Sequence, residues 1–213
     1  IAGAAASDVQ AGYTSGQVGV EELLNAVPQA KKIANLRGEQ ISNIGSQDMN
    51  DEVWLKLARR VNELAAMPDL TGLGITHGTD TIEETAYFVN LVVKWKKPVV
   101  MRAAMRPSTA LSADGPLNFF NAVAVAANPD AAGRGVLVVI NDWIHGASSL
   151  TKTSTTAVQT FLSPLRGLIG TVAYAEVEFY RGPVGRHTVD SEFSLDGITT
   201  LPRVDIVMAY ENM

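Results

Sequence analysis

The sequence predicts an α/β protein with an open, mostly parallel sheet, flanked by helices on both faces and carrying an appended β-hairpin. Two observations predict the sheet: short apolar runs alternate with amphipathic stretches of helical length, and the runs are rich in valine without polar alternation. Such strands are typical of parallel sheets that helices cover on both sides. A third observation predicts the hairpin, because apolar and polar side chains alternate over residues 173–180.

The elements follow one another along the chain as βαβ units require. Residues 20–36 have helical spacing and are divided by Pro28, and residues 51–66 form a second expected helix after Asn50, a good N-cap residue. The remaining expected elements are, in order, a strand at residues 70–76, a helix at 81–96, a strand at 98–101, a helix at 114–127, a strand at 135–140 and a last strand at 204–208.

Composition and charge argue against several classes of function. The 213 residues include 17 basic and 22 acidic side chains, a formal net charge of −5 that does not suit a nucleic-acid partner. The longest apolar runs are far shorter than the roughly 20 residues of a membrane-spanning helix. Cysteine is absent, so the chain offers neither disulfides nor thiolate metal ligands.

Three polar clusters follow predicted strands or precede predicted helices. They are residues 45–48, residues 77–81, and residues 104–108 running on to 112–115. In an open parallel sheet, loops at the carboxyl ends of the strands form the ligand crevice. The second cluster places the hydroxyl of Thr79 beside the carboxylate of Asp80 at a helix start, where backbone N–H groups also attract anions. We therefore expect the three clusters to converge on one crevice.

Each cluster also has a purely structural interpretation. Asp80 with Glu83, or Thr81 with Glu84, has the spacing of a helix capping box. Residues 46–48 are ordinary turn residues. Lys152, which follows the predicted strand at 135–140, is by default a solvated lysine, although a lysine beside a threonine hydroxyl can activate it. Residue patterns alone leave both interpretations open.

Metal and phosphate sites have no support in the sequence. The histidines His77, His145 and His187 are far apart and lack the paired spacing of metal ligands. No glycine-rich phosphate loop follows a predicted strand. We therefore expect a protein that needs no cofactor and no metal.

Residues 75–88 read Ile-Thr-His-Gly-Thr-Asp-Thr-Ile-Glu-Glu-Thr-Ala-Tyr-Phe. With this stretch the chain resembles the bacterial L-asparaginases, most closely the type II branch that includes the glutaminase-asparaginases, whose second signature it follows almost residue for residue. The resemblance covers essentially the whole chain. Further agreement lies in residues 38–40, 43–49, 104–109, 112–116, 121–123 and 201–206.

The resemblance implies hydrolysis of the side-chain amide of L-asparagine, and also of L-glutamine, to the acid and ammonia. The family uses a threonine nucleophile and no cofactor. By this resemblance Thr79, Lys152 and Asp80 form a catalytic set, in which Lys152 is the proton partner of Thr79. Tyr13 matches the tyrosine of a mobile loop that assists the family's first threonine.

The resemblance also implies how the substrate is bound. Ser46 and Gln47 match residues that bind the α-carboxylate and amino ends of the substrate, and Asp80 holds its α-amino group. Ala104 matches a position whose backbone lines the amide pocket. Sites for both α-groups select an amino-acid substrate, because together they fix one side-chain length between them and the attacked carbonyl.

The ends of the chain lead to expectations about its completeness. The family's first signature is Thr-Gly-Gly-Thr-Ile-Ala-Gly, and residues 1–3 match only its last part. We expect residues 1–200 to be the large N-terminal domain without its first strand and nucleophile threonine, and residues 201–213 to begin the connection to an absent C-terminal domain. Such a piece should have little activity alone. By analogy with type II members, the complete enzyme is expected to be a periplasmic homotetramer that binds no nucleic acid and no membrane.

Several residues depart from the family's usual pattern. Two positions that are usually aliphatic in the family are occupied by Gly74 and Arg102. Three positions where the family more often has smaller or charged residues are occupied by Trp95, Trp143 and Ser148. Arg102 interrupts an apolar strand, so we expect it to be buried, and burying an unpaired guanidinium is costly.

Two alternatives to the enzyme remain open at this point. The first is a non-catalytic amino-acid or anion binding domain, which keeps Ser46, Gln47 and Asp80 but lacks the first threonine. The second is a folded domain without a ligand, in which the site residues serve only as caps and turns. Binding of L-aspartate and release of ammonia distinguish the three.

Overall fold

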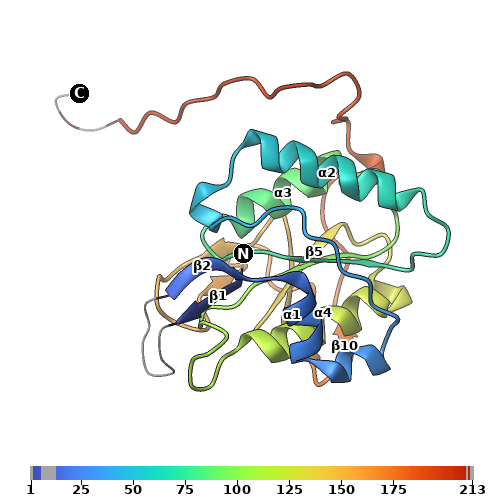
Figure 1. Cartoon of the computed structure of the whole chain (residues 1–213). Helices are drawn as coiled ribbons and strands as arrows, with labels where there is room; N and C mark the ends of the chain where they lie inside the picture. The colour runs from blue at the N-terminus through green and yellow to red at the C-terminus, as the bar shows by residue number, and fades with distance from the viewer. Residues whose placement is uncertain (1, 6–12, 210, 212–213) are drawn as a thin grey trace.

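The computed structural model describes residues 2–5, 13–209 and 211 of the chain. Figure 1 shows a central sheet with helices above and below it, and a C-terminal segment that runs away from the body of the molecule. A two-stranded antiparallel ribbon, β1 (Ala2–Ala5) with β2 (Tyr13–Val18), lies near the N-terminus. In the described part of the chain, no helix is long and apolar enough to cross a membrane.

The central sheet has six strands in the order β10-β9-β6-β5-β4-β3 among the described residues. Its parallel half joins β3 to β4 and β4 to β5, and its other half continues with antiparallel pairs. The predicted α/β class is therefore confirmed. The strands are β3 (Leu73–Thr76), β4 (Val99–Arg102), β5 (Val136–Ile140), β6 (Trp143–Gly146), β9 (Gly170–Ala173) and β10 (Glu176–Phe179).

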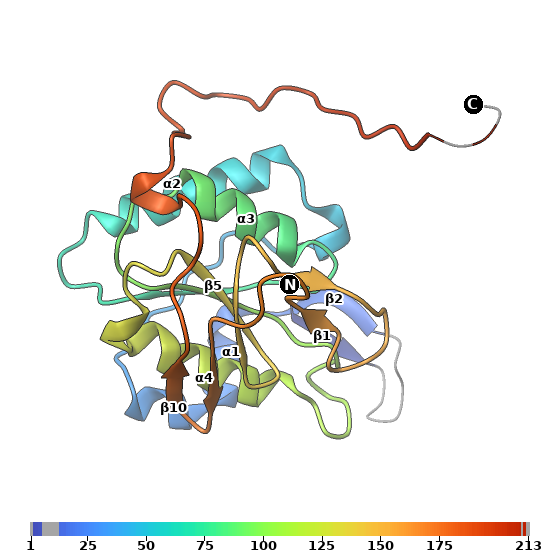
Figure 2. The same cartoon turned by 180° about the vertical axis from the view of Figure 1, so that it is seen from behind.

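Helices cover both faces of this sheet, as predicted. Helices α2 (Asp51–Ala65) and α3 (Ile82–Val92) lie on one face, and α1 (Val20–Ala26) and α4 (Gly115–Ala127) lie on the other (Figures 1 and 2). Successive residues of the buried strands point to opposite faces. Val136, Val138 and Ile140 of β5 therefore join the core under α3, while Leu137 and Val139 join the core under α4.

The helix boundaries follow local capping chemistry. The Asn50 side chain accepts a hydrogen bond from Val53 N at 3.1 Å and caps α2, as predicted. Helix α3 ends at Val92, earlier than the predicted residue 96. The physical reason is a competing acceptor, because Lys94 N donates to the Asn62 side chain at 2.8 Å instead of to the helix. Pro28 begins a short 3-10 turn, η1 (Pro28–Lys32), directly after α1, so the expected division is confirmed.

The appended hairpin is formed by β9 and β10, which confirms the prediction from alternation. Tyr174 and Ala175 at its turn have φ values of 50° and 74°, which a tight two-residue hairpin requires. A second hairpin, between β5 and β6, was not predicted. Its turn residues Asn141 and Asp142 also have positive φ, and an Asn-Asp pair between two apolar runs is the signal that could have predicted it.

The expected last strand at residues 204–208 is wrong. This segment pairs with no other strand of the described chain, and Val204 and Ile206 are 81% and 87% exposed. Figure 1 shows it extending away from the sheet. An apolar run of strand length forms a strand only where a neighbouring backbone can accept and donate hydrogen bonds, and no strand of the described residues lies beside it.

Arg102, the last residue of β4, is buried as expected. The side chain is 5% exposed, and its Nε and Nη2 atoms have no hydrogen-bond partner within the described chain. Burial lowers the pKa of Arg102 to about 10, and the charge of Asp114 acts in the opposite direction. The guanidinium therefore remains charged at neutral pH in an apolar setting, over the Phe119 ring at 5.1 Å.

Replacing Arg102 with valine should raise the melting temperature. Exchanging a poorly compensated buried charge for an apolar side chain stabilises by about 1–4 kcal/mol. For a chain of this size that corresponds to a rise of at least about 2 °C. Circular dichroism recorded during thermal unfolding at pH 7.5 in HEPES measures this change in melting temperature. An unchanged or lower melting temperature in Arg102→Val would contradict the prediction.

Candidate active site

The polar clusters predicted from the sequence meet at the carboxyl edge of the parallel strands. Strand β3 ends at Thr76, and residues 77–81 lead from it into α3. A short 3-10 turn, η2 (Ser46–Asp48), lies against the same loop. Strand β7 (Thr151–Lys152), paired with β8 (Phe161–Leu162), brings a distant part of the chain to this edge. Loops from separate strands therefore share one crevice.

Lys152 links the two central residues of the predicted catalytic set. Its Nζ atom donates to Thr79 Oγ1 at 2.9 Å and to Asp80 Oδ1 at 2.7 Å. Thr79 is 7% exposed, whereas the Asp80 side chain is 50% exposed and the Lys152 side chain 16%. The interpretation of Lys152 as a solvated surface lysine is therefore wrong. The arrangement places a buried hydroxyl, an amine and an open carboxylate within one hydrogen-bonded group.

Ser46 joins this group from the other side of the loop. Its Oγ atom accepts from Asp80 N at 3.2 Å, and its carbonyl oxygen accepts from Thr81 Oγ1 at 2.7 Å. Because the Thr81 hydroxyl is engaged in this way, it does not cap α3, although Thr81 is the N-cap residue. The capping interpretation of Thr81 with Glu84 is therefore wrong.

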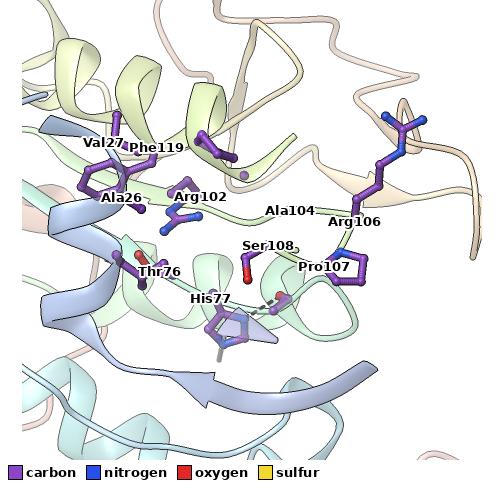
Figure 3. Close-up of a pocket in the computed structure, with 14 residues that line it drawn as sticks. Ala26, Val27, Thr76, His77, Arg102, Ala104, Arg106, Pro107, Ser108 and Phe119 are labelled. Atoms are coloured by element: carbon purple, nitrogen blue, oxygen red, sulfur yellow. Dashed lines mark hydrogen bonds between the residues drawn. The ribbon is translucent and has the colours of Figure 1, made fainter. Parts of the chain in front are cut away.

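Gln47 and Ala104, two further predicted site residues, make no hydrogen bond to this group within the described chain. The exposed Gln47 side chain bonds to Asp48 Oδ2 at 3.3 Å and folds over Gly45, where an added Cβ would lie 2.2 Å from the Gln47 amide nitrogen. Ala104 lines a cavity together with His77 (Figure 3). The Tyr13 position lies in β2, and its side chain falls outside the described part of the chain.

A chain of hydrogen bonds beneath the loop fixes its backbone. Trp54 Nε1 donates to Thr85 Oγ1 at 2.8 Å, and Thr85 Oγ1 lies 3.0 Å from His77 Nε2. His77 Nδ1 lies 2.8 Å from the carbonyl oxygen of Gly78. A carbonyl only accepts, so Nδ1 carries the proton and Nε2 accepts from Thr85. The group is consistent with a neutral His77 that orients the residues preceding Thr79.

Burial lowers the pKa of His77 to about 4, while the hydrogen bond to the Gly78 carbonyl acts in the opposite direction. The unfolded chain binds a proton near pH 6.5, so His77 contributes stability that is complete above that pH and is lost as the pH falls to about 4. We expect a loss of about 3 kcal/mol across this window. Urea unfolding of wild type and His77→Gln at pH 7.5 and pH 4 measures it, because glutamine does not titrate. Equal losses in both proteins would contradict the prediction.

Glu83 was missed by the sequence analysis as a site residue. Its Oε2 atom accepts from the backbone N–H of Lys152 at 2.6 Å. A glutamate in the first turn of a helix suggests a capping role, and the spacing of Asp80 and Glu83 was interpreted in that way. The contact of Glu83 with Lys152 spans 69 positions of the chain, so local spacing does not indicate it. Glu83 instead ties α3 to β7 and sets the position from which Lys152 reaches Thr79.

The group of Thr79, Asp80, Lys152 and Ser46 can perform two tasks. A threonine hydroxyl held by an amine can exchange a proton during acyl transfer. A half-exposed carboxylate beside it can hold an ammonium group. Together these features suit a small amino-acid ligand whose side chain points toward Thr79.

The chain matches known proteins along its length. The family model "Asparaginase, N-terminal" matches residues 1–185. The probable periplasmic L-asparaginase of Haemophilus influenzae and the L-asparaginase 2 of Escherichia coli are each 53% identical over 212 residues, which cover all of this chain and 60% of each relative. The glutaminase-asparaginase of Pseudomonas fluorescens biotype A is 49% identical over 214 residues, covering all of this chain and 59% of that relative.

The fold comparison agrees. The crystal structure of a probable cytoplasmic L-asparaginase from Campylobacter jejuni has a TM-score of 0.97 and 46% identity, over all of this chain and 65% of that one. The chain spans about 60% of the length of the curated relatives it matches. With a family model over most of its length and this agreement in fold, the chain belongs to the asparaginase family.

Proposed function

We propose that the protein hydrolyses the side-chain amide of L-asparagine, and also of L-glutamine, to the corresponding acid and ammonia. The observation that carries the proposal is the position of Lys152 Nζ, within hydrogen-bond distance of both Thr79 Oγ1 and Asp80 Oδ1. The names of relatives, L-asparaginase and glutaminase-asparaginase, support the choice of substrates.

Within this proposal each residue has one task. Amide hydrolysis through a threonine nucleophile forms a bond between the threonine oxygen and the amide carbon, breaks the C–N bond, and transfers a proton to the departing ammonia. Water then cleaves the resulting ester. Lys152 and Thr79 exchange the protons of these steps, and the half-exposed Asp80 carboxylate holds the substrate's α-ammonium group. No cofactor takes part.

The remaining predicted residues complete the binding site in this proposal. Ser46 and Gln47 hold the α-carboxylate and amino ends of the substrate, and both follow Gly45 in the turn that lies against the Asp80 loop. The backbone of Ala104 lines the amide pocket. Tyr13 assists the nucleophile from the opening segment of the chain.

The proposal extends to domain organisation and assembly. Residues 1–200 would form the N-terminal domain, and residues 201–213 would begin a connection to a further domain. The exposure of Val204 and Ile206 supports such a connection, because both apolar side chains lack a packing surface within the described chain. We also propose a periplasmic homotetramer. The name of the Haemophilus influenzae relative supports this location, while that of the Campylobacter jejuni structure points to the cytoplasm.

Isothermal titration with L-aspartate tests the binding half of the proposal. Asp80→Asn should weaken binding of this product at least about tenfold, because one charge-assisted hydrogen bond to the α-ammonium group is lost. Asp130→Asn is the matched control, since Asp130 lies in the 3-10 turn η3 (Pro129–Ala131), before β5 at the opposite edge of the sheet. Equal affinity in wild type and Asp80→Asn would contradict the assignment.

Glu83→Ala should lower kcat for L-asparagine by about 10–100-fold in the full-length protein. The substitution frees the backbone of Lys152, and a displacement of about 1 Å at a reacting group can cost about 10²-fold in rate. Glu83→Gln keeps a side-chain acceptor and should retain most of the activity. Glu84→Ala is the control, because Glu84 is the exposed neighbour on the same helix. A Glu83→Ala enzyme with wild-type kcat would show that Glu83 does not position Lys152.

A further inference from the structure

Lys152 reaches the candidate active site from a very short hairpin. The ladder between β7 and β8 contains two residue pairs, one of which joins Lys152 to Phe161. A two-stranded ladder of this kind is marginally stable on its own. Lys152 Nζ nevertheless lies 2.9 Å from Thr79 Oγ1 and 2.7 Å from Asp80 Oδ1. Contacts outside the ladder must therefore fix the backbone from which the Lys152 side chain extends.

Two such contacts fix Lys152 itself and the strand opposite it. Glu83 Oε2 accepts from Lys152 N at 2.6 Å. Phe161, the partner of Lys152 in the ladder, is 2% exposed and belongs to the same core cluster as Leu150. Neither contact reaches the carboxyl side of Lys152, where residues 153–160 connect the two strands. A connection of this length has many conformations unless further bonds select one.

Thr160 binds both of the residues that follow Lys152. Its carbonyl oxygen accepts from Thr153 N at 2.9 Å and from Thr153 Oγ1 at 2.7 Å. Its hydroxyl accepts from Ser154 N and donates to Ser154 O, each at 2.6 Å. A hydroxyl can do both at once, because it has one hydrogen and two lone pairs. One side chain therefore satisfies both backbone groups of Ser154, as a neighbouring strand would.

Burial makes the conformation of the connection depend on Thr160. Thr160 is fully buried, so bulk water does not compete for its hydrogen bonds. Loss of the hydroxyl would leave the backbone groups of Ser154 without these partners, a cost that a shift of the backbone toward solvent relieves. The Ser154 hydroxyl in turn accepts from Thr156 N at 3.3 Å and from Ala157 N at 3.2 Å. The bonds of Thr160 thus fix the start of the connection, and those of Ser154 extend it.

We propose that Thr160 is a positioning residue for Lys152, because it holds residues 153 and 154 and with them the backbone from which Lys152 Nζ reaches Thr79. The hydrogen bonds that Thr160 makes in the described chain go to Thr153 and Ser154, so it acts through the backbone. The inference rests on the proposed function, in which Lys152 and Thr79 exchange protons.

Acetylation of lysine amines by a water-soluble N-hydroxysuccinimide ester, measured by peptide mass spectrometry, tests the position of Lys152 without turnover. Valine has the shape of threonine but no hydroxyl. In the full-length Thr160→Val protein, Lys152 should react at least about threefold faster than in wild type, because its amine is released from hydrogen bonds to Thr79 and Asp80. The reaction rate of the exposed Lys96 should not change.

Three further variants of the full-length protein serve as comparisons. Thr160→Ser keeps the hydroxyl and should retain the wild-type reaction rate of Lys152. Thr155→Val is the matched control, since it makes the same substitution at an exposed residue of the same connection, and it should behave like wild type. Thr153→Val removes a bond to the Thr160 carbonyl at an exposed residue. Lys152 should react at least about twofold faster in this variant, which decides the test if Thr160→Val does not fold.

The kinetics of ammonia release from L-asparagine give a second measurement. Thr160→Val should lower kcat by at least about tenfold, because a small displacement of Lys152 Nζ misaligns it with Thr79. The affinity for L-aspartate should change less than about threefold, since Asp80 and Ser46 lie on other elements. A role in stability alone would lower the fraction of folded protein without changing the reaction rate of Lys152 in the folded fraction.

Four results would overturn the inference. They are an unchanged reaction rate of Lys152 in folded Thr160→Val, a wild-type kcat in that variant, an equal change in Thr155→Val, and a change in Thr160→Ser as large as that in Thr160→Val. Absence of turnover in wild type would instead contradict the proposed function, and the reaction rates of Lys152 would still decide whether Thr160 positions it.

Discussion

Replacing Lys152 with methionine should lower kcat for ammonia release from L-asparagine by about 10³-fold in the full-length protein. Methionine has a similar length but no amine, so Thr79 loses the partner that lies 2.9 Å from its hydroxyl. General acid–base groups contribute about 10²–10⁴ to the rates of such reactions. A coupled assay for ammonia measures kcat and KM.

Lys96→Met is the matched control for this loss. Lys96 is exposed and lies at the opposite edge of the sheet, before β4, so its removal should leave kcat unchanged. Circular dichroism should show the same fold in both variants. A Lys152→Met enzyme with more than about a tenth of the wild-type kcat would remove Lys152 from the proton-transfer steps.

Leu137→Ala should destabilise the chain by about 2–5 kcal/mol. Leu137 lies in the central strand β5, is fully buried, and packs in the core beneath α4 with Val100 and Ile144. Truncation removes apolar contact and leaves a cavity that neighbouring strands cannot close, because they are hydrogen-bonded on both sides. The midpoint of urea unfolding gives the change in stability.

Leu165→Ala is the same chemical change at an exposed site. Leu165 is 96% exposed, so its truncation should change the free energy of unfolding by no more than about 0.5 kcal/mol. Similar destabilisation by the two substitutions would mean that the core does not lie where the structure places it.

The core of the fold could be predicted because hydrophobic patterning determines it. The unbroken apolar run Val136–Ile140 is consistent only with burial on both faces, and all five residues are buried. The cap at Asn50 and the break at Pro28 act over a few residues, so local sequence sufficed for them. The prediction of secondary structure was wrong where the conformation of a segment depends on whether another strand lies beside it. Residues 204–208 have the composition of a strand but no strand beside them.

The candidate active site, like the fold, could be predicted from local sequence only in part. Polar loops at strand ends predicted a crevice. The contact of Lys152 with Thr79 joins residues 73 positions apart, so residue patterns did not predict it. Only the resemblance to a family suggested this contact. Glu83 acts through the backbone of Lys152, a contact that no residue pattern reveals. Arg102 was expected to be buried because it interrupts an apolar strand, yet its neighbours around the cavity in Figure 3 come from four separate segments.

The most direct test of the part that Thr79 takes in the proposed hydrolysis is a measurement of ammonia and L-aspartate released from L-asparagine by the full-length protein and by its Thr79→Val variant. We predict equimolar release of both products by wild type and a fall in kcat of about 10³-fold in Thr79→Val. Binding of L-aspartate without turnover in wild type would instead indicate an amino-acid binding protein. Turnover that is unchanged in Thr79→Val would place the chemistry elsewhere and contradict the account.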